Sequence, residues 1–403
     1  MTELVVHLCG RRAGRLIRKD NGNLQFRYDA GYDGPPLSLT LPIRAEAHPH
    51  AACLAVFGGL LLEGDARSAL ARSLGLSAAN DFGLLEELGG DCAGAISLLP
   101  EGIEPRVSGE RRVVDEAALD ALLLDLPQRP LAADPEHGIR LSLAGAQPKV
   151  PLIRDNDGTL ALPLDSESPT THILKPELDR FPGLVDNEAF CMALARACEL
   201  PVASVRKRRS VTGLAYLEVE RYDRDLTSDP IRRLHQEDFC QALGVPSDRK
   251  YQAEGGPGVR DCVTAIRAAT GVPAQELPRF LRAVVFNWLI GNCDAHAKNF
   301  SLLYDGGAPT LAPLYDLVST VVYPRLTTRL AMSVGSATRL EQVGGRAWLA
   351  LADDIGVRPA FVTRIRDEIA ERVAAALPDL LATAEHDNEA ARAVAARVTS
   401  LIR

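Results

Sequence analysis

The sequence predicts an α+β fold in which a β-rich lobe precedes a helical lobe, with a small α+β subdomain in front of both. Three observations predict it. Short apolar runs separated by turns rich in Gly, Asp and Pro fill residues 141–220, whereas helical spacing dominates beyond residue 237. Residues 1–105 show their own mixture of strand and helix patterns. We therefore expect three parts, residues 1–105, 106–235 and 236–403, with a ligand bound in the crevice between the two lobes.

The first part is expected to contain strands at residues 4–8 and 25–28, which flank an Asn21-Gly22 turn typical of a hairpin. Apolar residues at helical spacing from 57 to 76 predict a helix broken by Gly64, and a strand follows at 94–99. Residues 103–138 are expected to be a Pro-rich linker with a short helix at 116–124.

The second part is expected to hold strands at 141–143, 150–153, 160–164, 172–174, 202–205, 211–212 and 215–220, with a helix at 187–198. The third part is expected to hold helices at 279–290, 360–376 and 388–401 and a strand pair at 300–303 and 310–312. The basic run 206–209 is interpreted as a solvated turn, with a nucleic-acid patch as the less favoured alternative.

Composition excludes several classes of protein. The chain has 403 residues, a net charge of −8, 46% apolar and 24% charged residues, as in an ordinary globular protein and unlike a chain that binds nucleic acid with its whole surface. The apolar runs are too short to cross a membrane, and the N-terminus does not resemble a secretory signal. The eight cysteines form no C-x-x-C pair. We expect a cytoplasmic protein without disulfides or a zinc site.

The segment 292–300 is the most informative. It places Asp294 five positions before Asn299, at the end of an apolar helix and before an apolar strand. Protein kinases use this D-x-x-x-x-N spacing in their catalytic loop, where the Asp takes the proton of the acceptor hydroxyl and the Asn binds magnesium. The spacing alone is weak, because such pairs also occur by chance.

Three further features stand in the order that a phosphotransfer site requires. The small-residue turn 142–149 would let backbone amides approach phosphate oxygens, although alone it reads as an ordinary turn. Lys175 ends an apolar strand and is either a strand-edge charge or the lysine that pairs with the ATP phosphates, with Glu188 as its candidate partner. Asp316 follows a hairpin and is either a turn residue or a second magnesium ligand. The order favours phosphotransfer that uses ATP and Mg²⁺.

The motifs also resemble the HipA family of serine/threonine kinases, the toxins of bacterial HipB–HipA modules. The resemblance runs nearly end to end and is carried by the following segments: 57–61, 93–95, 142–149, 171–175, 186–188, 220–224, 236–238, 250–251, 255–258, 291–301 and 315–316.

This resemblance implies a bilobal protein-kinase-like fold and a role for each matching residue. The phosphates of ATP are bound by Lys175 and by the phosphate loop, which comprises Ala144, Gly145, Ala146, Gln147 and Lys149. The adenine meets the backbone around Glu220 and Tyr222. Asp294 is the catalytic base with His296 and Lys298 beside it, and Asn299 and Asp316 bind magnesium. Ser142 corresponds to the autophosphorylated serine, whose phosphate would repel ATP and pull the loop out of the cleft.

The resemblance further implies a toxin that phosphorylates an aminoacyl-tRNA synthetase, such as glutamyl-tRNA synthetase, and so causes growth arrest and persistence. Its implied partner is a HipB-like antitoxin with a helix-turn-helix, through which it would reach operator DNA. Two alternatives stay open. One is a mainly non-catalytic co-repressor of its operon, and the other is a small-molecule or lipid kinase.

Overall fold

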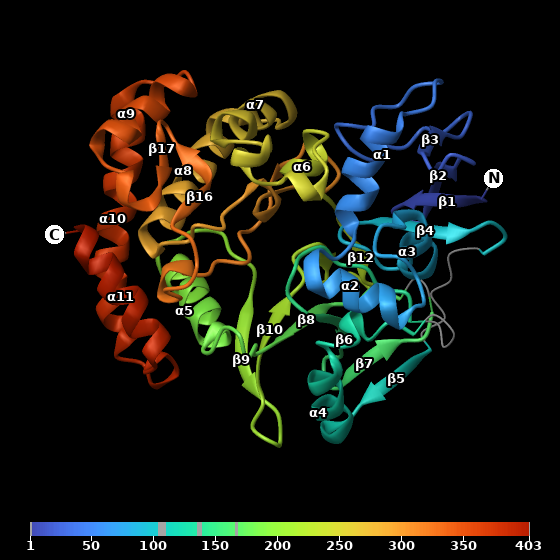
Figure 1. The fold of residues 1–403 in the computed structure, drawn as a ribbon, viewed down its shortest axis with the longest axis horizontal. Helices are drawn as coiled ribbons and strands as arrows, with labels where there is room; N and C mark the ends of the chain where they lie inside the picture. The colour runs from blue at the N-terminus through green and yellow to red at the C-terminus, as the bar shows by residue number, and fades with distance from the viewer. Residues whose placement is uncertain (1, 104–109, 135–138, 166–167, 403) are drawn as a thin grey trace. The chain divides into compact units, whose positions relative to one another are not determined.

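The computed structural model describes residues 2–103, 110–134, 139–165 and 168–402, so part of the expected linker 103–138 lies outside the described residues. The chain folds into two compact units (Figure 1). Unit 1 comprises Met1–Pro176, Arg208–Ser247 and Leu303–Asp305, and unit 2 comprises Glu177–Lys207, Asp248–Leu302 and Gly306–Arg403. The three-part division expected from the sequence is finer than this and stays a prediction.

Unit 1 begins with a four-stranded antiparallel sheet of order β3-β2-β1-β4. Its strands are β1 (Thr2–Leu8), β2 (Arg11–Arg18), β3 (Leu24–Tyr28) and β4 (Ile96–Pro100), and the helices α1 (His50–Phe57), α2 (Gly64–Ser73) and α3 (Asp81–Leu88) share its core. The Asn21-Gly22 turn does form a hairpin, but its first strand is β2, which the sequence did not predict. Strand β2 mixes four arginines with the buried Ala13 and Leu16, so the sequence shows no clear apolar alternation there. The prediction of one helix over residues 57–76 was wrong in its first part. Phe57 ends α1, a 3₁₀ turn follows at Gly58–Leu60, and Gly64 is the first residue of α2.

A second sheet of six strands follows in the order β5-β7-β6-β8-β10-β9. These are β5 (Arg111–Val114), β6 (Val150–Arg154), β7 (Leu160–Pro163), β8 (His172–Pro176), β9 (Val205–Arg209) and β10 (Ala215–Glu220), and helix α4 (Glu116–Asp125) contacts β5. Four predicted strands and the short helix are confirmed. Residues 141–143 form a single bridge, from Leu141 to Asp91, and no strand.

The basic run was interpreted wrongly as a turn. Residues 205–209 are β9, an edge strand of this sheet, and the predicted strands at 202–205 and 211–212 are replaced by it. Two of its four cations form ion pairs, because Lys207 contacts Asp186 at 2.7 Å and Arg208 contacts Glu218 at 3.5 Å. Charges on an edge strand also oppose pairing with another chain.

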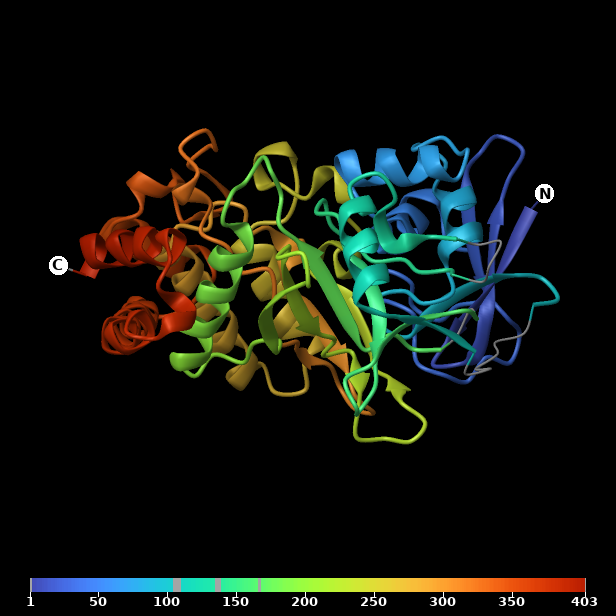
Figure 2. The same ribbon diagram turned by 90° about the horizontal axis from the view of Figure 1, so that it is seen from below.

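The helices of unit 2 are α5 (Leu184–Ala197), α7 (Val259–Ala269), α8 (Pro273–Ile290), α9 (Gly345–Asp354), α10 (Pro359–Leu381) and α11 (Glu389–Ile402). Helix α10 contacts α5, α8, α9 and α11, and Figures 1 and 2 show α10 and α11 side by side. Short strands β14 (Ser301–Tyr304), β15 (Thr310–Leu311), β16 (Arg329–Val334) and β17 (Ala337–Arg339) lie between helices in the sequence. The predicted helices are confirmed, and α8 extends further toward the N-terminus because Pro273 can occupy a first helical turn.

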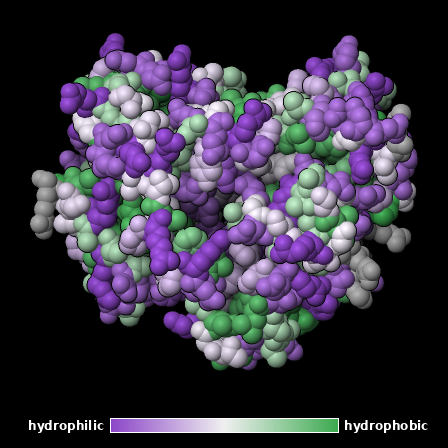
Figure 3. All heavy atoms as spheres, in the orientation of Figure 1, coloured by the Kyte–Doolittle hydropathy of each residue, from purple (hydrophilic) through white to green (hydrophobic). Residues whose placement is uncertain are grey.

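The sequence analysis made expectations about disulfides and about membrane-spanning segments. In the structure, all eight cysteines are free thiols, and seven of them are buried. Within the described part of the chain, we find no helix with the length and hydropathy needed to span a membrane. Hydrophilic and hydrophobic residues are mixed over the face shown in Figure 3.

A buried ionic network joins distant segments of unit 1. The Asp91 carboxylate follows α3 and contacts Arg224 at 2.7 Å, Arg233 at 3.1 Å and Arg221 at 3.2 Å. Asp223 also contacts Arg221, at 2.8 Å. Burial alone would raise the pKa of Asp91, but the three guanidinium groups and a hydrogen bond from Thr170 hold it well below its usual range. The network therefore links the N-terminal sheet and its helices to the segment that follows β10.

We predict that Asp91→Asn destabilises unit 1 by roughly 3–5 kcal/mol at neutral pH, because it leaves buried guanidinium groups without their carboxylate. The lowered pKa means that Asp91 contributes stability above its unfolded-state pKa. The difference between wild type and variant should thus narrow as the pH falls below about 4.

Scanning calorimetry at several pH values measures this difference. Asp33→Asn is the control, because the Asp33–Arg11 pair is solvent-exposed and should contribute little. Equal effects of the two substitutions would contradict the role of the network.

Candidate active site

The segment with the D-x-x-x-x-N spacing is a loop that follows helix α8. The helix ends at Gly291, which adopts a left-handed conformation with φ of 73°. A Cβ at this position would lie 2.4 Å from a methyl group of Val321, so the close approach of the two segments requires glycine. The loop then runs through Asp294 to a short 3₁₀ turn at Ala297–Asn299 and enters β14.

A relay of buried amides fixes the loop to α8. Asn287 in the last turns of the helix donates to the Ala283 carbonyl at 2.9 Å and accepts from Asn292 at 2.8 Å. Asn292 in turn accepts from the backbone N–H of Asp294 at 3.1 Å. Because Asn287 and Asn292 are both buried, losing either partner would leave an unsatisfied polar group. The relay therefore determines where the backbone of Asp294 lies.

Asn299 and Asp316 meet directly. The Asn299 amide donates to Oδ2 of Asp316 at 3.0 Å, and its Oδ1 accepts from the backbone N–H of His296 at 3.2 Å. Asp316 has a φ of 58°, which is uncommon for a residue other than glycine. Strained backbone of this kind concentrates at functional sites, where the surrounding structure maintains it.

The Asp316 segment is tied to the loop of Asp294 and to α5. Thr320 donates its N–H to the Gly291 carbonyl at 3.1 Å, and its hydroxyl accepts from Cys293 N–H at 2.9 Å. Asn187 exchanges two hydrogen bonds with the backbone of Ser319, each 2.9 Å long. Asn187 is fully buried. Unit 2 thus holds both candidate loops in one hydrogen-bonded framework.

Asn299 and Asp316 each carry a side-chain oxygen of the kind that magnesium prefers, and their side chains lie in hydrogen-bond contact. Magnesium prefers oxygen ligands and usually keeps several waters or phosphate oxygens, so two protein ligands suffice. Among the residues that the structure describes, no group of three or more His, Cys, Asp and Glu is arranged to hold a metal. A magnesium ion held by Asn299 and Asp316 would therefore take its remaining ligands from water or from the phosphates of a nucleotide.

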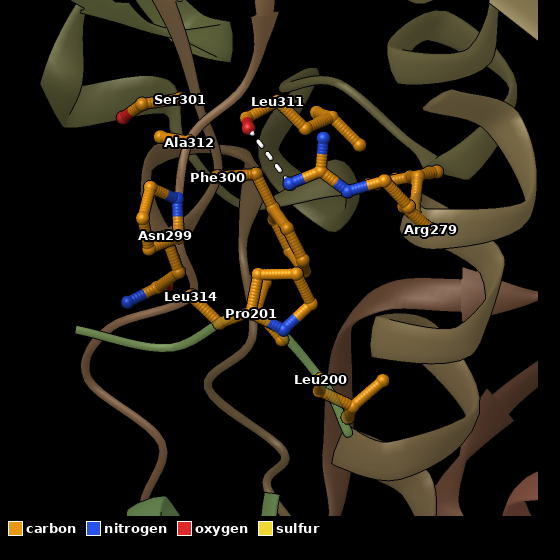
Figure 4. Close-up of a pocket in the computed structure, with 11 residues that line it drawn as sticks. Leu200, Pro201, Arg279, Asn299, Phe300, Ser301, Leu311, Ala312 and Leu314 are labelled. Atoms are coloured by element: carbon orange, nitrogen blue, oxygen red, sulfur yellow. Dashed lines mark hydrogen bonds between the residues drawn. The ribbon is translucent and has the colours of Figure 1, made fainter. Parts of the chain in front are cut away.

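A pocket within unit 2 adjoins this loop (Figure 4). Asn299 and Phe300 form part of its wall, and Arg279 of α8 closes another part by donating to the Leu311 carbonyl at 3.1 Å. Its remaining lining residues are mostly apolar: Leu200, Pro201, Phe280, Ser301, Leu311, Ala312, Pro313 and Leu314. The side of the loop that faces this pocket is therefore mainly apolar.

Unit 1 holds the second half of the predicted site, the turn 142–149. Gly145 has a φ of 112° and pairs with Leu62, and its carbonyl accepts from Glu63 N–H at 3.0 Å. The Lys149 ammonium donates to the Ala144 carbonyl at 2.7 Å and thereby crosses the turn. Gln147 donates to the Pro176 carbonyl at 3.4 Å. The small-residue turn is thus held by its own lysine and by the segment that precedes α2.

Ser142 is completely buried in this structure. Its hydroxyl donates to the Leu60 carbonyl at 2.9 Å, and its N–H donates to the Asp91 carbonyl oxygen at 3.0 Å. Both partners belong to the N-terminal segment, so the start of the turn is anchored there.

The other predicted residues of unit 1 lie on neighbouring strands. Lys175 on β8 is buried and faces Leu217 on β10 in the antiparallel register. Glu220 is the last residue of β10, and the hydroxyl of Tyr222 donates to Gln236. Glu188 is buried in α5 of unit 2, so its predicted pairing with Lys175 joins residues of different units and stays a prediction.

The structure therefore brings Asp294, His296, Lys298, Asn299 and Asp316 together in unit 2, and the turn with Lys175 together in unit 1. The sequence did not reveal the roles of Asn287, Asn187 and Thr320. The position of Asn287 inside the otherwise apolar run 284–290 was the one available signal, since a buried amide in such a helix needs a partner.

Family models cover most of the chain. The HipA N-terminal domain matches residues 4–99, and the HipA-like C-terminal domain matches residues 141–377. The chain belongs to the HipA family.

Individual relatives agree with this membership. The protein Y4mE of Sinorhizobium fredii, which its name proposes to be a kinase, is 47% identical over 92% of this chain and 90% of its own length. The serine/threonine-protein kinase toxin HipA of Shewanella oneidensis is 29% identical over 94% of this chain and 89% of its own.

A solved structure of Shewanella oneidensis HipA with HipB and operator DNA matches with a TM-score of 0.86 and 25% identity. The match covers 99% of this chain and 96% of that one. The predicted α+β, protein-kinase-like fold is thereby confirmed.

We predict that Asn187→Ala loosens the segment after Asp316 in this HipA-family protein. The substitution removes the acceptor of the Ser319 N–H, so amide hydrogen exchange at Ser319 should accelerate by roughly 10-fold or more. Asn80→Ala serves as a control. It removes the side-chain cap of α3 in unit 1 and should leave exchange at Ser319 unchanged. Unaltered protection in the Asn187 variant would contradict the framework described above.

Proposed function

We propose that this chain is an ATP- and magnesium-dependent serine/threonine protein kinase that acts as the toxin of a toxin–antitoxin module. The observation that carries the proposal is the 3.0 Å hydrogen bond between Asn299 and Asp316, on a framework that also positions Asp294. Membership of the HipA family and the kinase names of its relatives support it.

In the proposed reaction, Asp294 takes the proton of the acceptor hydroxyl while that oxygen attacks the γ-phosphorus of ATP. Lys298 and His296 lie beside the base, and Asn299 and Asp316 would hold magnesium. The ion would neutralise phosphate charge, which supplies much of the catalysis in this class of reaction.

The residues of unit 1 would bind the nucleotide. Lys175 and the Ala144–Ala146 backbone, with Gln147 and Lys149, would contact the phosphates. The backbone around Glu220 and Tyr222 would meet the adenine.

Ser142 is the proposed site of autophosphorylation. Because its hydroxyl is buried against Leu60, it can be phosphorylated after the turn has left this position. Departure of the turn breaks the Ser142–Leu60 hydrogen bond and the pairing of Gly145 with Leu62. A phosphate on Ser142 would then oppose its return, so that modification silences the kinase.

We propose a HipB-like helix-turn-helix antitoxin as the partner, with operator DNA contacted mainly through it. The solved complex of the Shewanella HipA with HipB and operator DNA supports this, and the net charge of −8 fits indirect DNA contact. The proposed substrate is an aminoacyl-tRNA synthetase such as glutamyl-tRNA synthetase, whose phosphorylation would cause growth arrest and persistence in the cytoplasm.

We predict that the purified protein transfers phosphate from ATP to Ser142, and that Asp294→Asn lowers the rate by roughly 10²–10⁴-fold, because the general base is lost. Mass spectrometry of the phosphopeptide measures the rate. The substitution should leave the thermal midpoint nearly unchanged, since Asp294 is exposed.

Asp367→Asn is a matched control, because Asp367 is an exposed carboxylate paired with Arg366 on α10. Undiminished transfer by the Asp294 variant would refute its role. Phosphate found solely on small molecules of a cell lysate would favour a different class of kinase.

A further inference from the structure

The segment from Lys250 to Gly258 carries a motif, Lys-Tyr followed by Gly-Gly-Pro-Gly, to which the reaction above assigns no role. In the structure it brings Tyr251 to the candidate base. The phenolic hydroxyl of Tyr251 donates to Oδ1 of Asp294 at 2.9 Å. Both residues belong to unit 2.

The glycines of the motif hold Tyr251 in place. The carbonyl of Tyr251 accepts from the N–H groups of Glu254 and Gly256, each at 2.9 Å. A Cβ at Gly256 would lie 2.1 Å from the Arg249 carbonyl oxygen, so this tight turn requires glycine. The Gln252 side chain accepts from Ser333 N–H at 2.7 Å and ties the turn to β16.

The ring of Tyr251 is fixed from two sides. It packs edge-on against the imidazole of His296, with 5.6 Å between the ring centroids. On another side, the Lys250 ammonium lies over the Tyr251 ring, 5.4 Å from the centroid of that ring. His296 is buried and its N–H bonds to Asn299. Tyr251 thus contacts both the base and the residue that adjoins the candidate metal ligand.

The backbone of Asp294 is held by Asn292 and by the hydrogen bond from His296 N–H to its carbonyl at 2.8 Å. The direction of the exposed Asp294 carboxylate depends on contacts of the side chain, and the hydrogen bond from the Tyr251 hydroxyl is one of them. A carboxylate has two oxygens, so a donor that holds Oδ1 determines the direction of Oδ2. Hydrogen bonds to a charged oxygen are stronger than neutral ones and hold it more firmly.

We propose that Tyr251 is a positioning residue of the kinase, which holds Oδ1 of Asp294 so that Oδ2 is directed toward the acceptor hydroxyl. The inference rests on the function proposed above. In the step concerned, the acceptor oxygen forms a bond to the γ-phosphorus, the bond from that phosphorus to the β,γ-bridging oxygen breaks, and ADP leaves. The acceptor proton passes to Asp294.

Tyr251→Phe tests this, because it removes the hydroxyl and keeps the ring against His296. Transfer from ATP to Ser142 should slow by roughly 10–100-fold in kcat, since small misplacements of a reacting group cost about this much. The KM for ATP and the affinity for a fluorescent ATP analogue should stay within roughly 2-fold. Tyr32→Phe is the matched control, because the Tyr32 hydroxyl donates to the Pro35 carbonyl in unit 1.

The decisive readout is the double variant. If Tyr251 acts through Asp294, then Tyr251→Phe should have no further effect on kcat in an Asp294→Asn background, so the two losses are not additive. Additive losses, a fall in ATP affinity, an unchanged kcat or an increased kcat would each overturn the proposal. A wild-type protein that transfers no phosphate would instead refute the proposed function itself.

Discussion

The hydrogen bond between Asn299 and Asp316 is the contact on which the candidate site depends. The two residues lie 17 positions apart, and several independent contacts bring them together. The amide relay through Asn287 and Asn292 anchors the first loop, and Asn187 and Thr320 anchor the second. The backbone of Asp316 is held at a positive φ, which persists because the surrounding hydrogen bonds outweigh its cost. Buried side-chain amides, together with Thr320, therefore position the loop of Asp294 and the segment after Asp316.

In unit 1, ion pairs connect the distant segments that hydrogen-bonded side-chain amides connect in unit 2. Asp91 and Asp223 pair with the buried Arg221 and Arg224, Asp91 also contacts the partly buried Arg233, and the backbone carbonyl of Asp91 accepts from Ser142. The N-terminal sheet and its helices are thus connected to the phosphate-loop candidate at Ser142 and Gly145 and to the segment after β10. We infer that the N-terminal part of the chain helps to hold this turn, because rearranging Ser142 must break contacts with Leu60.

The correct predictions of helices, strands and candidate site residues came mostly from patterns within short stretches of the sequence. Asp294, Asn299 and Asp316 were identifiable because their spacing and order are local, and β6, β7, β8, β10, α5 and α8 have clear apolar periods. Strand β2 was not predicted and β9 was interpreted wrongly as a turn, because both are rich in basic residues whose partners, such as Glu3 and Glu218, lie on neighbouring strands. The roles of Asn187 and Asn287 depend on tertiary contacts and could not be read from spacing. The predicted pairing of Lys175 with Glu188 joins residues of different units, so patterns within one stretch of the sequence could not establish it.

We propose that Asn299 and Asp316 form a magnesium site for ATP. The most direct test of this proposal is an anomalous difference map from crystals grown with Mn²⁺ and a non-hydrolysable ATP analogue. We predict one peak within about 2.0–2.3 Å of an Asp316 carboxylate oxygen and of Oδ1 of Asn299, the range typical of hard divalent cations. Bound nucleotide with the metal peak away from both side chains would contradict the account.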